Sequence, residues 1–163
     1  MAKKEEKTNV MRALDKAHIP YRHYAYPVED GHIDGAAVAA KLGQNPEQVF
    51  KTLVTKGAGG GYFVFVIPVA KELDLKAAAR AVREKSVSMI PVAEINRVTG
   101  YIRGGCSPIG MKKLYPTVVD ESCLGLTTII FSAGRIGAQV EVAPQDLLGL
   151  IRGKTAPITA HTA

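Results

Sequence analysis

The sequence predicts an α+β fold in which helices flank a mixed, largely antiparallel sheet. Its β-rich and helical segments do not alternate strictly along the chain, as they would in a doubly wound fold. Residues 48–55 and 62–69 are β-rich and are separated by the glycine-dense stretch 57–61, which predicts a hairpin with a well-buried second strand. Aromatic residues make up only 6% of the chain and tryptophan is absent, so the expected core is aliphatic.

Local signals place the other elements. Thr8 is expected to cap a first helix that runs to about His18. One face of that helix carries the apolar residues Val10, Met11, Leu14 and Ala17. Gly43 and Gly100 each end a later helix, and residues 101–110 form a strand edge followed by a glycine-rich loop. The remaining elements are a strand over 21–26, helices over 34–42, 75–85, 91–98 and 146–152, and strands over 117–120, 127–132 and 138–142.

The length of 163 residues suits one domain, and no repeat or linker divides it. We therefore expect a single domain over 1–163, with its core at about 10–152 and frayed ends, including the tail after Gly153. The start of the chain lacks a signal-peptide pattern, and no apolar run approaches the ~20 residues that span a bilayer. These features predict a cytoplasmic protein without a membrane partner.

The formal net charge of +6 favours a polyanionic partner such as nucleic acid, although a basic soluble protein would show the same value. The positive charge is scattered and forms no basic arm. Cys106 and Cys123 form no Cys-x-x-Cys pair, so neither a disulfide scaffold nor a structural zinc site is expected. No Gly-x-Gly-x-x-Gly or Walker-type loop is present, and the histidines lack metal-ligand spacing, so no cofactor or metal is indicated.

Lys51 is the first residue that suggests chemistry. In an extended segment it shares a face with Val49 and Leu53, which aims its ammonium at the interior or at a cleft. A charged lysine there is unfavourable unless an anion or a polar cluster meets it. The alternative is an edge strand from which Lys51 extends outward to solvent.

The stretch from Gly104 to Gly110 is the most unusual part of the sequence. Its two adjacent glycines, Gly104 and Gly105, let the backbone approach a ligand closely, and Pro108 stiffens the turn. Exposed N–H groups in this loop are suited to a carbonyl oxygen or a developing oxyanion. An ordinary tight turn would have the same composition. Lys112 and Lys113 follow and suit phosphates, but also an ordinary surface.

Two further features leave alternatives open. Cys106 as a nucleophile would need a nearby base, and the histidines lie far from it in sequence. The second glycine-rich stretch, 132–137, predicts either a simple hairpin turn or a pocket in which Ser132 and Arg135 meet a ribose or a phosphate.

These features occur together in an order known for one family. The matching segments are Val49-Phe50-Lys51-Thr52-Leu53, Pro68-Val69 with Leu73-Asp74-Leu75-Lys76, Thr99-Gly100-Tyr101, Gly104 to Lys113, Thr117-Val118-Val119-Asp120, and Ser132 to Gly137. The chain resembles the YbaK/EbsC group, the free-standing relatives of the editing domain inserted in bacterial prolyl-tRNA synthetases. The likeness covers about Val10 to Leu150.

The resemblance implies a barrel-like, mostly antiparallel sheet and hydrolysis of mischarged aminoacyl-tRNA, typically cysteine on proline tRNA. It implies binding of the acceptor end of tRNA, with no DNA partner, and it raises the hypothesis of a complex with prolyl-tRNA synthetase. Lys51, Gly104 and Gly105 are assigned to the chemistry. The residues assigned to the substrate pocket are Tyr26, Thr52, Cys106, Ser107, Pro108, Ser132, Gly134 and Gln139.

One position departs from the family pattern. Close bacterial deacylases carry Asp in the strand after the second glycine-rich turn, where this chain has Gln139, with Glu141 two residues on and on the same strand face. A glutamine cannot act as a charged acceptor. No Ser-His-Asp or Cys-His set is visible, so substrate-assisted ester cleavage is expected. The alternatives are a module that binds aminoacyl-tRNA or a synthetase without turnover, and a thiol hydrolase that uses Cys106.

Overall fold

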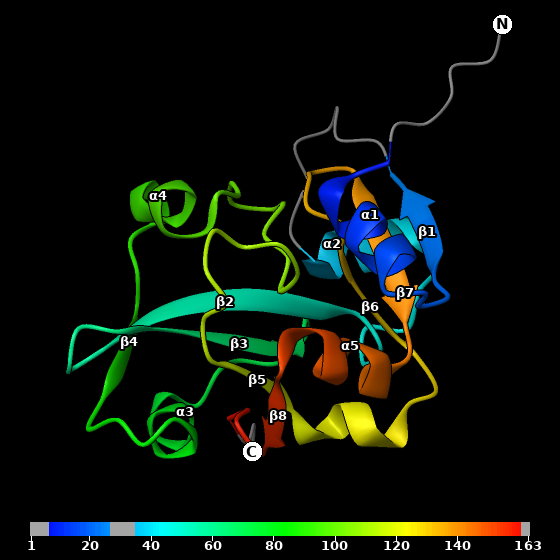
Figure 1. The fold of residues 1–163 in the computed structure, drawn as a ribbon. Helices are drawn as coiled ribbons and strands as arrows, with labels where there is room; N and C mark the ends of the chain where they lie inside the picture. Colours follow the sequence, from blue (N-terminus) through cyan, green and yellow to red (C-terminus); the bar gives the residue numbers. More distant parts are fainter. Residues whose placement is uncertain (1–6, 27–34, 161–163) are drawn as a thin grey trace, which may run out of the picture.

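The computed structural model describes residues 7–26 and 35–160 (Figure 1). None of the helices in these ranges has the length and apolar character needed to cross a membrane. The helices are α1 (Asn9–Lys16), α2 (Gly35–Leu42), α3 (Leu75–Ala81), η1 (Val92–Glu94), α4 (Ile95–Thr99), η2 (Glu121–Gly125) and α5 (Pro144–Ile151). The strands are β1 (Arg22–Ala25), β2 (Phe50–Gly57), β3 (Tyr62–Pro68), β4 (Val87–Met89), β5 (Thr117–Asp120), β6 (Ile129–Ser132), β7 (Ala138–Val142) and β8 (Lys154–Ala156).

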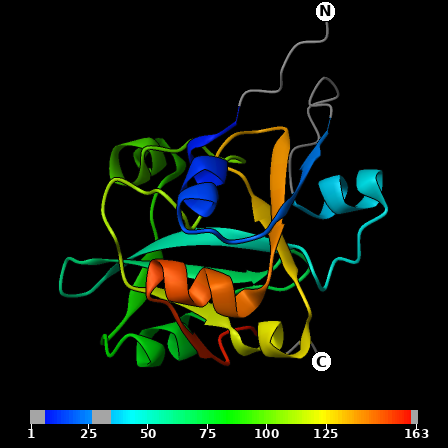
Figure 2. The same cartoon turned by 45° about the vertical axis from the view of Figure 1, so that its right-hand side comes forward.

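Within the described residues the strands form two sheets, with orders β4-β2-β3-β5-β8 and β1-β7-β6. Pairing is antiparallel except for β3–β5 and β5–β8. The predicted α+β fold with a mixed, mostly antiparallel sheet is confirmed. The strands do not close into one barrel, and instead the two sheets pack at an angle with helices around them (Figure 2).

The predicted hairpin is confirmed as the β2–β3 pair. Its register runs from Phe50 opposite Pro68 to Lys56 opposite Tyr62. The glycine turn closes with a hydrogen bond of 2.7 Å from the Gly57 amide to the Gly61 carbonyl. From Val64 to Pro68 every residue of β3 is buried, because both faces of the strand are covered.

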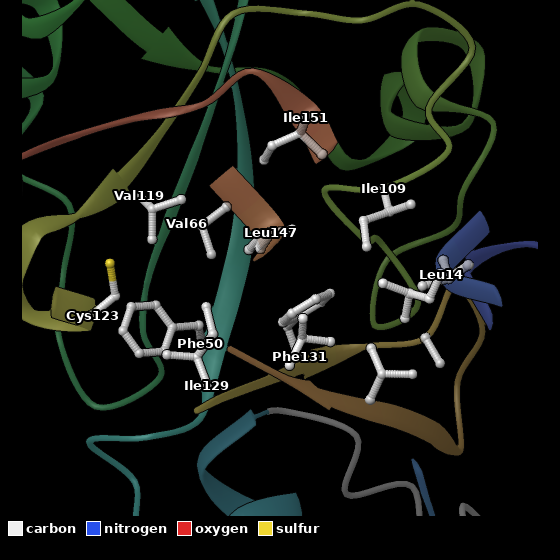
Figure 3. Packing of buried hydrophobic residues seen from close by; sticks show 14 of the residues in the cluster. Leu14, Phe50, Val66, Ile109, Val119, Cys123, Ile129, Phe131, Leu147 and Ile151 are labelled. Carbon is white, nitrogen blue, oxygen red and sulfur yellow. The ribbon is translucent and has the colours of Figure 1, made fainter. Parts of the chain in front are cut away.

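The two sheets join where β2 begins. Val49 forms a parallel bridge with Ile130, and the Ile130 amide donates to the Gln48 carbonyl at 2.9 Å. Beside this junction, side chains from β2, β3, β6, α1 and α5 meet in the largest core cluster (Figure 3). Phe50 and Phe131 are its aromatic members, and Leu14 and Leu147 from the two helices are completely buried. The expected aliphatic core is confirmed, with phenylalanine filling the sheet junction.

Helix ends follow local chemistry with two corrections. The Thr8 hydroxyl accepts from the Met11 amide at 3.2 Å, so the predicted cap is confirmed, but α1 ends at Lys16 and Ala17 is exposed rather than buried. Helix α3 ends at Ala81 instead of Lys85, because Arg83 adopts a left-handed φ of 59°. The expected start of α2 at Asp34 lies outside the described residues. No strand forms at Tyr101.

The expectation of a frayed tail after Gly153 is wrong for most of that segment. Residues 154–156 form β8, which adds to β5 in parallel at the edge of the larger sheet. Ile158 is completely buried, and its amide donates to the Asp120 carboxylate at 3.1 Å. The sequence signal was weak because the segment is short and its partner lies far away in the chain.

We expect Ile158→Ala to lower the free energy of unfolding by about 2–5 kcal/mol, because the substitution leaves a cavity against Phe65 and Val118. The matched control is Ile102→Ala, since Ile102 is 55% exposed and should cost far less. Urea unfolding monitored by circular dichroism measures both. Equal midpoints for the two variants would show that the tail does not contribute to the fold.

Candidate functional site

The Gly104–Gly110 loop has a fixed shape in the structure. Gly104 and Gly110 have φ values of 87° and 80°, which favour glycine. The Tyr101 hydroxyl donates to the Ile109 carbonyl at 2.5 Å and anchors the far end of the loop. The Gly105 amide donates to the Ile102 carbonyl at 2.9 Å. The Gly105 N–H group is therefore occupied in this conformation.

The two glycine-rich stretches pack against each other. A Cβ on Gly105 would lie 3.0 Å from both the Arg135 Cα and the Ile136 amide nitrogen. Gly134 has a φ of 98°, and a Cβ there would lie 3.1 Å from Val10 and 3.2 Å from Tyr101. At the Gly105 contact backbone meets backbone, so the loop and the β6–β7 turn form one rigid unit.

The side chains of the loop point into the protein. Cys106 packs with Val54, Ile90 and Val98, and burial raises the pKa of its thiol to about 11. Ser107 is completely buried, and its hydroxyl accepts from the Ile109 amide at 3.4 Å. A thiol that stays protonated near neutral pH is a poor nucleophile. The loop can therefore offer its backbone to a ligand more readily than these two side chains.

Strand β2 carries Lys51 and Thr52 on opposite faces. Thr52 shares the loop-side face with Phe50 and Val54, and its buried hydroxyl has no hydrogen-bond partner among the described residues. Lys51 lies on the other face with Leu53, as predicted, and is half-buried. Burial lowers the pKa of Lys51, while the nearby Glu72 carboxylate partly opposes that shift. Both side chains are thus held in less favourable surroundings than a purely structural role requires.

The edge of β2 near Lys51 lies between two pairings. Strand β4 pairs only with residues 55–57, and the second sheet touches β2 at Val49. The bridge between Val49 and Ile130 is parallel, so Lys51 and Ser132 each lie two residues beyond it in the same direction. Ser132 in turn pairs with Gln139, and Gln139 pairs with Tyr24. The four strands place these residues at one level of the structure.

The face of the three-stranded sheet that lies away from the main core carries several polar side chains. Ala138, Val140 and Val142 belong to the core, so the alternate residues Gln139 and Glu141 share the opposite face, as predicted. The Glu141 carboxylate accepts from the Tyr24 hydroxyl, and also from the Thr128 hydroxyl at 2.6 Å. Thr128 accepts from the Gln48 amide at 2.8 Å. The hydrogen bond to Glu141 is the largest cause of a raised pKa at Tyr24.

Gln139 is only 5% exposed and is held by a second amide. Its Oε1 accepts from the Gln44 Nε2 at 2.8 Å, and the Gln44 Oε1 is buried without a partner among the described residues. An amide pair can hold Gln139 in one orientation without any charge. Whatever an aspartate would contribute here as an anion must come instead from Glu141 or from the ligand.

The predicted residues therefore fall into two groups. Loop residues and Thr52 lie on one face of β2, and Lys51 lies on the other face beside Ser132 and Gln139. Within residues 7–26 and 35–160, no hydrogen bond or ion pair joins Lys51 to the loop.

Sequence reasoning singled out Tyr26, whose amide donates to the Gly137 carbonyl at 2.9 Å. The polar network instead contains Tyr24, Gln44, Gln48 and Thr128. In the sequence, only Tyr24 could have been identified, because the period-two alternation of a strand puts it on the same face as Tyr26. In the described ranges, no three His, Cys, Asp or Glu side chains are grouped as metal ligands.

We expect Gly105→Ala to destabilise the protein by about 1–3 kcal/mol, because its methyl group meets backbone atoms that cannot swing away. Gly125→Ala is the control, since a Cβ at Gly125 meets nothing within 4 Å. Thermal unfolding of both variants checks the prediction. A wild-type melting temperature for Gly105→Ala would mean that the loop and the turn are not rigidly packed.

Comparisons with known proteins find matches over most of the chain. Residues 33–150 match the family described as the aminoacyl-tRNA editing domain. An Enterococcus faecalis (strain ATCC 700802 / V583) protein named "Putative Cys-tRNA(Pro)/Cys-tRNA(Cys) deacylase EbsC" is 45% identical over 161 residues, 98% of each chain.

Solved structures share the fold. One, described as "Crystal structure of a putative trans-editing enzyme for prolyl tRNA synthetase", is 25% identical, with a TM-score of 0.79 over 93% of this chain and 95% of that one. The hypothetical protein APE2540, 24% identical, has a TM-score of 0.83 over 93% of this chain and 99% of its own. On the family match and the full-length relative together, this chain belongs to the aminoacyl-tRNA editing domain family.

Proposed function

We propose that this protein is a cytoplasmic deacylase that hydrolyses cysteine from mischarged tRNA, with Cys-tRNA(Pro) as its main substrate. Family membership and the name of the 45% identical relative support this assignment. The positive net charge suits the acceptor end of tRNA. A complex with prolyl-tRNA synthetase is part of the proposal, supported by the likeness to the solved trans-editing enzyme of the same fold.

An editing site is needed because size alone discriminates poorly. A pocket that accepts proline rejects a side chain of similar size by only ~1–3 kcal/mol. A second site that hydrolyses the wrong ester adds the missing selectivity. Hydrolysis consumes one water and releases free amino acid and the terminal ribose hydroxyl of tRNA.

The observation that carries the proposal is the half-buried Lys51 at the level of Ser132 and Gln139. A lysine whose pKa is lowered by burial is stabilised when an anion arrives. The phosphate next to the terminal ribose would supply that anion and would fix the ester at the edge of β2. Ser132 and Gln139, at the same level, would contact the ribose or the amino acid.

The glycine loop would act on the ester carbonyl. The Gly104 amide is the proposed oxyanion donor, and the Gly105 amide would join it only by leaving its bond to the Ile102 carbonyl. Pro108 and the contact with Arg135 keep the loop in place. Tyr26, Thr52, Cys106, Ser107 and Gly134 stay assigned to the pocket, with Gly134 shaping its turn. The substrate would assist the cleavage. Its cysteine thiol would attack the ester carbonyl and pass its proton to the leaving ribose oxygen, and water would then open the cyclic thioester; alternatively, the free ribose hydroxyl would orient the water that attacks the ester.

A second candidate function is a module that binds aminoacyl-tRNA without turnover. Gln139 favours it, because its carbonyl oxygen is already bonded to Gln44 and the residue carries no charge. Equal affinity for charged and uncharged tRNA, with no loss of the amino acid, would establish that module and overturn the deacylase.

We expect Lys51→Met to abolish Cys-tRNA(Pro) hydrolysis and to raise thermal stability. Methionine keeps the packing of the stem and removes the unfavourable buried charge. The stability gain should shrink as pH rises toward the ordinary lysine pKa, because folded wild type then loses that charge before the unfolded chain does.

Deacylation of Cys-, Ala- and Pro-tRNA(Pro) by wild type and Lys51→Met tests this prediction together with unfolding curves. Lys76→Met is the matched control, since Lys76 is exposed on α3. We expect wild type and Lys76→Met to release cysteine but neither alanine nor proline, and we expect Lys51→Met to release none of the three. Ser-tRNA(Pro) should resist hydrolysis if the substrate thiol attacks. An active Lys51→Met enzyme would remove Lys51 from the mechanism.

We expect Cys106→Ala to keep most of the wild-type rate of Cys-tRNA hydrolysis. Its raised pKa leaves the thiol protonated, and its packing against Val54 and Val98 is structural. Single-turnover rates and alkylation with iodoacetamide check this. A rate reduced by a factor of ~100 or more, without a matching loss of stability, would restore the thiol-hydrolase alternative.

A further inference from the structure

A concave pocket lies where α1 meets the edge strand β1. Lys7 and Arg135 bring positive charge to its lining, and the aromatic residue Tyr21 lines it too, together with His23 and Tyr24. Figures 1 and 2 both show α1 and β1 beside β7, on the side of the molecule where the β6–β7 turn lies. The pocket therefore combines positive charge with an aromatic residue, Tyr21, the combination that binds single-stranded nucleic acid.

The charge of this pocket is partly restrained by one acidic residue. The Lys7 ammonium contacts the Asp15 carboxylate at 2.6 Å, and both side chains are substantially exposed. Arg135 is exposed at the tip of the turn. An incoming phosphate can therefore bind the Arg135 guanidinium directly and can compete with the Asp15 carboxylate for the Lys7 ammonium.

The position of the pocket connects it to the proposed ester site. Gly105 packs on the backbone of Arg135, so the turn that carries this guanidinium also supports the oxyanion loop. Ala138 lines the pocket, and the next residue is Gln139. Tyr24 lines it too, pairs with Gln139 and donates its hydroxyl to Glu141. Because Ala138 and Gln139 face opposite sides of the sheet, a strand bound in this pocket would approach the ester from the side of the glycine loop.

We propose that this pocket binds a backbone phosphate of the single-stranded acceptor end of tRNA, upstream of the nucleotide that carries the ester. The neighbouring base would stack on Tyr21. Such contacts position the substrate without reading its sequence, which suits an enzyme whose selectivity resides in the amino acid. This inference rests on the proposed function and adds a second anchor to the Lys51 site.

The test compares two substrates of wild type and Arg135→Ala: Cys-tRNA(Pro), and the cysteinyl ester of adenosine, which lacks phosphate. Alanine keeps the Arg135 Cα and hence the contact with Gly105. We expect KM for Cys-tRNA to rise about tenfold with kcat nearly unchanged, which corresponds to the loss of about 1.4 kcal/mol of binding free energy from one charged contact. The slope of log KM against log salt concentration should become smaller by about one, which is the contribution of one phosphate contact. Hydrolysis of the adenosine ester should not change.

Two variants sharpen the result. Arg80→Ala removes the same charge from α3, far from the pocket in the fold, and should leave KM near wild type. Asp15→Asn releases Lys7 and should lower KM for Cys-tRNA. Equal KM values for Arg135→Ala and Arg80→Ala would overturn the proposal, as would equal losses on both substrates.

Failure of the deacylase assignment gives a different result. If wild type hydrolyses neither ester, binding of an uncharged acceptor-stem RNA with a single-stranded 3′ end decides the matter, measured by fluorescence anisotropy at several salt concentrations. Weaker and less salt-dependent binding by Arg135→Ala would support the phosphate pocket in a protein without turnover. Identical binding by the two proteins would overturn it.

Discussion

The β2–β3 hairpin is the constraint on which the structure depends. Its seven paired positions bring apolar side chains to both faces at once, so one pair of strands serves clusters on opposite sides. Phe50, Val64 and Val66 pack against α1, α5 and β6, whereas Leu53, Phe65 and Ile67 pack against α3. A strand buried on both faces has little freedom to shift register. Lys51 and Thr52 inherit this rigidity from their place in β2.

Rigidity at the site also comes from glycine. Contact between Gly105 and the turn at Arg135 is possible only without a side chain, and it couples two segments that are irregular on their own. Loops fixed in this way can present backbone N–H groups without reorganising, which is what an oxyanion donor requires. The same turn carries Arg135, the proposed phosphate contact. One packing contact would therefore position both the glycine loop at the ester carbonyl and the tRNA strand that leads to the ester.

Several groups at the site are unfavourable for stability. The Thr52 hydroxyl and the Gln44 carbonyl oxygen are buried without partners among the described residues, and burial depresses the pKa of Lys51. Local rules of protein stability are broken most often where function requires it. Other buried polar side chains of the described core, such as those of Thr55, Thr99 and Asp120, form hydrogen bonds. An anionic ligand that met Lys51 would offset the cost of burying its charge.

The sequence by itself determined the features that local chemistry controls. Thr8 caps the first helix, Gly43 and Gly100 end two later helices, and the glycine stretch before Tyr62 turns the hairpin, because each depends on neighbours a few residues away. It also indicated Lys51, the glycine loop and Gln139 as site residues. Only the tertiary structure decided that β8 completes a sheet and that Tyr24 bonds Glu141, 117 residues further along the chain. Such pairings depend on how distant segments pack, and short segments of mixed composition carry no local signal of the partner that will bury them.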